Sequence, residues 1–200
     1  MNTLFLFLLT SLALTLLPGP DILFVITTSM HKGWKKGIKL SLGLTFGIIL
    51  HTFFVVAGLG SILTLYPEVI RLIEFSGAAY LIYLSLQSWR VKSSFSLESN
   101  KKVNQNLFVT GLIMNLSNPK VTLFFLSFFT GFLFHESWSY AIQFFVLGGI
   151  FFAQALFIFS SCSILAYRMG KKLKLLKHSD IWDKVQALIL FVIALILIYP

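Results

Sequence analysis

The sequence predicts an all-α integral membrane protein with six membrane-spanning helices. Its 200 residues are 57% hydrophobic and only 12% charged, whereas soluble domains carry about 25% charged residues. Apolar stretches near or above the roughly 20 residues needed to cross a bilayer recur along the whole chain. Because no polar segment between them is long enough to fold separately, we expect one membrane domain over residues 1–200.

Six apolar stretches define the predicted spans. They cover residues 4–28, 40–65, 69–89, 107–134, 140–167 and 181–199. Within lipid, every backbone polar group must be paired inside its own segment, so each stretch is predicted to be a helix. No Lys or Arg precedes Lys32. The first stretch therefore lacks the basic start of a cleavable signal peptide and is expected to be a retained helix.

The basic residues predict how these spans are oriented. Fourteen of the sixteen Lys and Arg residues lie in three connections, at residues 32–39, 90–102 and 168–184, while the alternate connections at 66–68 and 134–139 have none. Basic connections usually stay in the cytoplasm. We therefore expect both termini to face outward, and we attribute the net charge of +9 to this bias and not to nucleic-acid binding.

The connection at residues 91–106 divides the chain into two halves of three spans. It is rich in Ser, Asn and Lys, a composition typical of a solvated linker. Repeat one then covers residues 1–90 and repeat two covers residues 107–200. Because three is an odd number, the second half must enter the membrane from the opposite side. The sequence thus predicts two inverted three-helix repeats.

The first span contains a segment that a continuous helix disfavours, Leu-Pro-Gly-Pro-Asp from position 17. Pro18 and Pro20 lack amide hydrogens, and Gly19 between them adds backbone freedom. The carbonyls of Leu14 and Leu16 are expected to lose their helical donors. A break at membrane depth is tolerated only where it faces protein or a water-filled cavity. We therefore predict an interrupted helix whose break lines a cavity.

The fourth span carries a matching interruption, Asn-Leu-Ser-Asn-Pro-Lys from position 115. Pro119 is expected to free the carbonyl of Asn115, and the side chains of Asn115 and Asn118 to pair with exposed backbone. Interrupted segments at corresponding positions of two inverted halves indicate the central site of a transporter, where half-helix ends offer partial charges to a ligand. The alternative is that the prolines only kink packed helices.

Asp21 and Lys120 are the charged residues nearest the two breaks. A charge in the hydrocarbon region costs at least about 2.5–3.5 kcal/mol, so it usually faces the interior, pairs or serves function. We expect Asp21 to carry a proton or, with the carbonyls of Leu16 and Asn115, to hold a substrate ammonium group. Lys120 would attract a carboxylate. Two alternatives stay open: a structural Asp21–Lys120 salt bridge, and an Asp21 near the cytoplasmic interface, since ten residues separate it from Lys32.

Other features of the spans are less specific. His51 in the second span is a second candidate for proton transfer, although a histidine among apolar neighbours more often only hydrogen-bonds within the bundle. Gly43 and Gly47 recur four residues apart and predict close helix contact. Cys162 is the single cysteine, so no intrachain disulfide is expected. No metal-ligand cluster, phosphate loop or catalytic triad is recognisable, so we predict neither an enzyme nor a resident cofactor or metal.

These motifs resemble those of the LysE/RhtB family of bacterial amino-acid exporters. The resemblance covers nearly the whole chain and includes both proline motifs, the glycine-rich second span and Gly-Ala-Ala-Tyr-Leu-Ile-Tyr-Leu from position 77. It implies a six-helix exporter in the bacterial cytoplasmic membrane, driven by the proton gradient, with amino acids as substrates and a possible homo-oligomeric state. Asp21 is more similar to the homoserine/threonine-type branch than to the lysine branch. The alternatives are an exporter of another small solute, such as a metal ion, and a membrane assembly subunit that does not transport.

Overall fold

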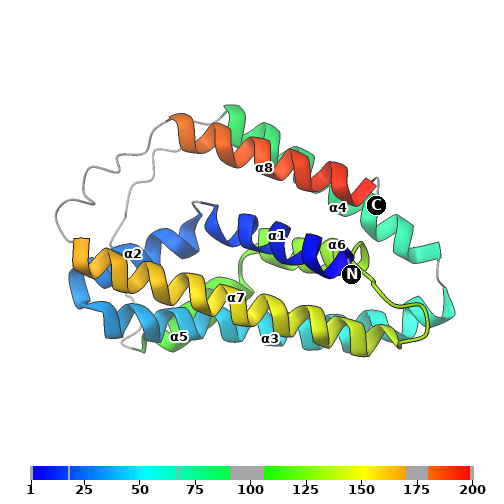
Figure 1. Cartoon of the computed structure of the whole chain (residues 1–200), viewed down its shortest axis with the longest axis horizontal. Coiled ribbons are helices and arrows are strands. Elements are labelled where there is room, and N and C mark those ends of the chain that lie inside the picture. The colour runs from blue at the N-terminus through cyan, green and yellow to red at the C-terminus, as the bar shows by residue number, and fades with distance from the viewer. Residues whose placement is uncertain (1, 18, 67, 91–105, 170–179, 199–200) are drawn as a thin grey trace.

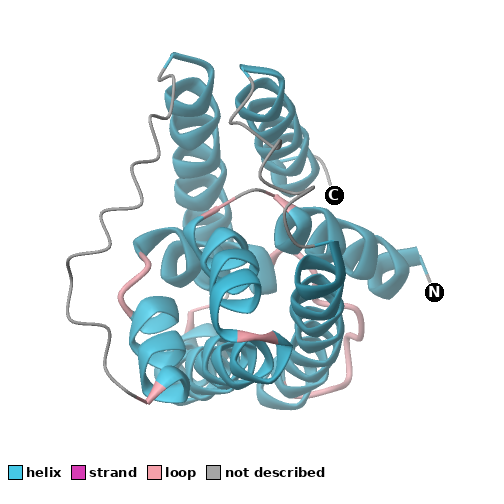
Figure 2. Cartoon of the chain, turned by 90° about the vertical axis from the view of Figure 1, so that its left-hand side faces the viewer, coloured by secondary structure: helices cyan, strands magenta, loops and turns pink. Residues whose placement is uncertain are grey.

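The described part of the chain consists of helices joined by short connections. The computed structural model describes residues 2–17, 19–66, 68–90, 106–169 and 180–198. In these ranges it contains eight α-helices and no strand (Figures 1 and 2). The helices are α1 (Asn2–Leu16), α2 (Pro20–Lys32), α3 (Trp34–Leu65), α4 (Glu68–Arg90), α5 (Leu107–Leu116), α6 (Pro119–Thr130), α7 (Tyr140–Met169) and α8 (Asp180–Ile198).

The helices lie along one long axis and alternate in direction (Figure 1). The pair α1–α2 runs opposite to α5–α6, α3 runs opposite to α7, and α4 runs opposite to α8. The end of α2, the start of α3 and the end of α7 therefore meet at the same end of the molecule. This arrangement gathers the described basic residues of the three predicted connections at that end, whereas residues 91–105 and 170–179 lie outside the described part.

The first basic connection is shorter than the sequence predicted. α2 and α3 are separated only by Gly33, whose φ of 89° lies in the region that glycine adopts without steric cost. The Gly33 amide donates to the Ser29 carbonyl at 3.0 Å and closes α2. Lys35 and Lys36 therefore lie on the first turn of α3 and not in a loop. Long basic side chains suit this position because their alkyl stems cover apolar surface while their amines reach water.

Two described helices are long and apolar enough to cross a membrane. They are residues Trp34–Gly58 within α3 and the whole of α7, Tyr140–Met169. α1 and α2 form a third span when they are counted together, with a bend of 57° between them. α5 and residues Ala187–Ile196 of α8 are apolar but shorter. These helices support a membrane protein, and the number of six spans stays a prediction.

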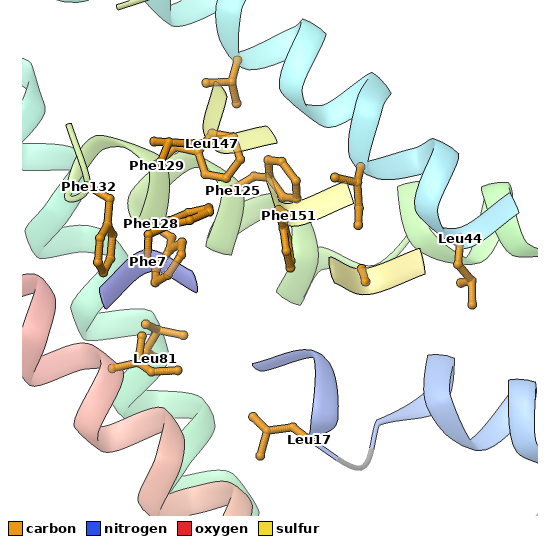
Figure 3. Close-up of a cluster of buried hydrophobic side chains, with 14 of the residues drawn as sticks. Phe7, Leu17, Leu44, Leu81, Phe125, Phe128, Phe129, Phe132, Leu147 and Phe151 are labelled. Atoms are coloured by element: carbon orange, nitrogen blue, oxygen red, sulfur yellow. The ribbon is translucent and has the colours of Figure 1, made fainter. Parts of the chain in front are cut away.

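The core at the end of the molecule opposite the basic residues is built largely from phenylalanine. Phe7 of α1 and Phe125, Phe128 and Phe129 of α6 are fully buried, as is Phe132 just after α6 (Figure 3). The Phe7 ring centroid lies 5.1 Å from that of Phe128 and 5.6 Å from that of Phe132. These separations fall in the range favoured by aromatic pairs. The rings pack α1 against α6 and leave the breaks at the edge of this cluster.

Glycines set the closest approach of α3 and α5. A Cβ on Gly43 would overlap the Phe108 carbonyl, and one on Gly111 would overlap the Leu40 carbonyl oxygen. The two backbones are therefore in direct contact, which confirms the close approach predicted from Gly43. One turn after Gly111, this contact seats the side chain of Asn115 against α3.

Candidate functional site

The first helix break forms where the sequence predicts it. α1 ends at Leu16 and α2 begins at Pro20, which stands at the first helical position, where a missing amide costs nothing. Gly19 caps α2 with an extended backbone, at φ −129° and ψ 177°, and makes no side-chain cap bond. Pro18 lies outside the described residues. The break turns the chain by 57° within a predicted span.

The second helix break is also confirmed. α5 ends at Leu116 and α6 begins at Pro119. The Asn118 carbonyl accepts from the amides of Val121 at 3.0 Å and Thr122 at 3.2 Å, so Asn118 stands at the start of α6. Lys120 lies in the first turn of α6, but its side chain is outside the described part of the chain, as is that of Pro119.

The two breaks meet at one cavity of about 80 Å³. Its wall contains Gly19, Pro20 and Asp21 from the first break and Asn115 and Asn118 from the second. Ends of all four half-helices contribute to the wall, together with the middle of α3 and of α7. One water molecule requires on the order of 10–15 Å³ of such cavity volume. The cavity could therefore hold several waters, or a molecule about the size of a small amino acid. Five of the predicted site residues thus share one cavity.

Asp21 is the ionisable residue in the described wall of this cavity. Its side chain is partly buried, and its Oδ1 atom is fully buried. Asp21 precedes Lys32 by eleven residues of continuous helix, which at about 1.5 Å per residue is roughly 16 Å. This distance is about half the thickness of a hydrocarbon core of roughly 30 Å. With Lys32 at the membrane surface, Asp21 would lie near the middle of the membrane.

Two carbonyls that were expected to be free are paired. The Leu17 amide donates to the Leu14 carbonyl at 3.3 Å, and the Asn118 amide donates to the Asn115 carbonyl at 3.1 Å. In both breaks the last helical turn tightens, so each carbonyl accepts from the amide three residues later and not from the one four residues later, which would be a proline. The expectation that Pro119 frees the Asn115 carbonyl is therefore wrong.

The side chain of Asn115 provides an unpaired acceptor at the second break. Asn115 is only 4% exposed, and its Oδ1 atom is buried with no hydrogen-bond partner among the described residues. A Cβ on Gly47 would overlap this side chain, so the absent side chain of Gly47 makes room for it. An unpaired buried polar atom costs about 1–3 kcal/mol. Because Asn115 lines the cavity, a ligand donor or a water that reaches this atom from the cavity would satisfy it.

His51 is brought to the second break by the tertiary structure. Its ring is stacked on Phe125 at a centroid distance of 5.2 Å and is hydrogen-bonded to the Asn115 backbone. The side chain is 6% exposed, and Nε2 is buried with no hydrogen-bond partner in the described part of the chain. His51 and Asn115 therefore form one buried polar pair beside the cavity, a contact between α3 and α5 that the mostly apolar sequence around His51 did not indicate.

Sequence reasoning missed the contribution of α7. Phe151, Ala155 and Phe159 line the cavity, and Gln154 between them donates from Nε2 to Thr15 Oγ1 at 2.9 Å. Thr15 itself lines the cavity at the end of α1. The only signal in the sequence was a glutamine in the middle of an apolar span. The described residues contain no group of three or more His, Cys, Asp or Glu that could hold a metal ion.

Comparisons with known proteins agree along almost the entire chain. Residues 12–200 match the family model described as LysE type translocator. The homoserine/homoserine lactone efflux protein of Salmonella typhimurium is 29% identical over 172 residues, which cover 85% of this chain and 83% of that protein. The leucine efflux protein of Salmonella choleraesuis is 28% identical over 178 residues, or 86% and 84% of the two chains. No solved structure matches the chain.

Proposed function

The chain belongs to the LysE type translocator family, and we propose that it exports amino acids across the bacterial cytoplasmic membrane in exchange for protons. Relatives named for efflux of homoserine, homoserine lactone and leucine support an amino-acid substrate. The protein is a transporter and not an enzyme. The observation that carries the proposal is the single cavity at which two broken helices bring together Asp21, Asn115 and Asn118.

The proposed architecture has six spans in two inverted repeats, with the basic connections in the cytoplasm. The pairs α1–α2 and α5–α6 each count as one broken span, and α3 and α4 correspond to α7 and α8. The opposite directions of corresponding helices support this assignment (Figure 1). So does their packing, because α5 lies on α3 while α2 lies on α7, so that each broken span contacts the long helix of the other repeat.

An amino-acid zwitterion requires partners for both of its charges, because an unpaired charge in a low-dielectric site is costly. The first turns of α2 and α6 both contribute to the cavity wall. Helix N-termini carry a partial positive charge and unpaired amides, so they suit the carboxylate, with Lys120 as an added attraction. Asp21 and Asn115 Oδ1 suit the ammonium group. Here the Asn115 side chain takes the role that was expected of its carbonyl.

Proton coupling would then operate through Asp21. Protonation of Asp21 from the outside removes the negative charge that holds the ammonium group, so the substrate is released outward while the proton proceeds inward. His51 is the second candidate for carrying the proton, because its ring bonds to the backbone of Asn115 and its Nε2 atom is buried with no hydrogen-bond partner in the described part of the chain. His51 is buried and Asp21 is partly buried. In the proposed orientation both would lie within the membrane, where ionisable groups are usually functional.

Proteoliposomes separate coupling from binding. Counterflow of labelled leucine or homoserine against an internal unlabelled pool needs no net proton movement, whereas uphill transport does. We expect Asp21→Asn to abolish uphill transport without preventing membrane insertion, and Lys120→Ala to weaken substrate binding. If wild-type protein moves no amino acid of a broad panel in either assay, the transport proposal is wrong and an assembly subunit is favoured.

Two comparisons distinguish the roles of the charged groups. If Asp21 and Lys120 only form a structural salt bridge, the double variant Asp21→Asn with Lys120→Gln should restore full efflux, and that result would overturn their assignment to the substrate site. His51→Gln keeps a hydrogen-bonding side chain but cannot titrate. We expect it to reduce uphill transport more than counterflow, whereas His31→Gln and His135→Gln, at exposed positions, should change neither.

A further inference from the structure

The cavity has both polar and apolar lining residues. The polar ones lie at or next to the two breaks, whereas α7 contributes an apolar stripe, in which Phe151, Ala155 and Phe159 follow one another at intervals of four residues. Residues spaced by four share one face of a helix. A substrate whose charged groups contact the breaks would therefore direct its side chain toward this stripe.

Ala155 is the smallest side chain of the stripe. It is 1% exposed and stands one turn from a phenylalanine on either side. Any larger side chain at this position would extend into a cavity of only about 80 Å³. Because a single water takes up on the order of 10–15 Å³ of such a volume, two or three added carbon atoms would occupy a substantial part of it. The size of residue 155 thus limits the space facing α7.

The charge distribution of the wall restricts the substrate further. Among the lining residues that the structure describes, Asp21 is the only ionisable one. Once Asp21 faces the substrate ammonium group, no described group on the α7 side can neutralise a second charge. A charged side chain placed against Phe151 and Phe159 would lose its water without gaining a partner, which is strongly unfavourable.

We propose that Ala155 determines the size limit for the substrate side chain, and that the site accepts amino acids with uncharged side chains no larger than that of leucine. This inference rests on the proposed export function and assigns the α7 stripe as the side-chain subsite. Ala155 acts by direct contact with the substrate, and Phe151 and Phe159 form the walls on either side of it.

The experiment measures counterflow of labelled alanine, homoserine, leucine, phenylalanine and lysine in proteoliposomes. One methyl group in an apolar pocket changes discrimination by about 10–200-fold. We expect Ala155→Val to lower leucine counterflow relative to alanine counterflow by a factor in this range. Ala155→Gly, which removes one carbon atom, should raise leucine counterflow relative to alanine counterflow, and wild-type protein should move neither phenylalanine nor lysine above the level of empty vesicles.

Ala166→Val is the matched control. Ala166 is also 1% exposed on α7 and does not line the cavity. It follows Ala155 by eleven residues, close to three full turns, so it occupies nearly the same helix face. The control should leave the ratio of leucine to alanine counterflow unchanged.

Three results would overturn the inference while the export function stands: an unchanged ratio of leucine to alanine counterflow in Ala155→Val, an unchanged ratio in Ala155→Gly, or phenylalanine or lysine counterflow equal to that of leucine in the wild type. Should Ala155→Val fail to insert, the Ala155→Gly comparison decides. Absence of counterflow for every amino acid in the wild type would instead disprove the export function itself.

Discussion

Substitution of Gly111 by alanine tests the backbone contact that positions the second break. A Cβ on Gly111 would overlap the Leu40 carbonyl oxygen and lie 2.8 Å from the Leu44 amide nitrogen, where ordinary contacts begin at 3.4 Å. Both partners are backbone atoms of α3 and cannot rotate away. The only relief is a separation of α5 from α3, by at least 0.6 Å if the Leu44 contact alone is considered.

The expected effect of Gly111→Ala is a clear loss of stability. Inserting a carbon into a well-packed interior costs about 1–3 kcal/mol, and the better helix propensity of alanine returns up to about 1 kcal/mol. A net loss of about 1–2 kcal/mol corresponds to a melting temperature lower by roughly 2–8 °C for a chain of this length. Efflux should fall as well, because Asn115 follows Gly111 by one turn and would move with α5.

Thermal stability in detergent, followed by fluorescence-detected size-exclusion chromatography, measures this loss. Gly149→Ala is the matched control, because Gly149 lies in α7 and a Cβ built there has no neighbour within 4 Å. The control should melt at or above the wild-type temperature. Equal melting temperatures for the Gly111 and Gly149 variants, with equal efflux, would refute the claim that the backbones of α3 and α5 are in contact.

Two further predictions concern the ends of the molecule. Gln143→Leu removes hydrogen bonds to the amides of residues 134 and 135 and to the carbonyls of residues 135 and 138, all between 2.8 and 3.0 Å. At about 0.5–1.5 kcal/mol each, their loss should destabilise the α6–α7 loop and speed its proteolysis, whereas Gln87→Leu, at an exposed position, should not. In a Cys162→Ala background, an impermeant thiol reagent should label Ser137→Cys in whole cells but not Lys36→Cys. Labelling of Lys36→Cys from outside would reverse the predicted orientation.

The sequence by itself determined where the helices break and which residues gather at each end. A proline lacks its amide hydrogen in any fold, so the interruptions before Pro20 and Pro119 follow from local chemistry alone. The charge pattern is similarly local, because Lys and Arg avoid the hydrocarbon wherever they occur. The sequence could not predict the pairing of the Asn115 carbonyl. It shows that Pro119 cannot donate to this carbonyl, but not that the Asn118 amide does so in the tightened turn.

Only the tertiary structure decided which side chains share the cavity. Asp21 and Asn115 belong to different halves, and Ala155 lies on another helix, α7. Their proximity depends on how far each helix is rotated about its axis and how closely it packs against its neighbours. No periodic pattern or motif in the sequence predicts either quantity. The rotation and spacing of α5 are set by backbone contact at Gly43 and Gly111, a property of two helices together. For this reason the sequence predicted a cavity at the breaks, whereas its apolar wall on α7 became visible only in the folded molecule.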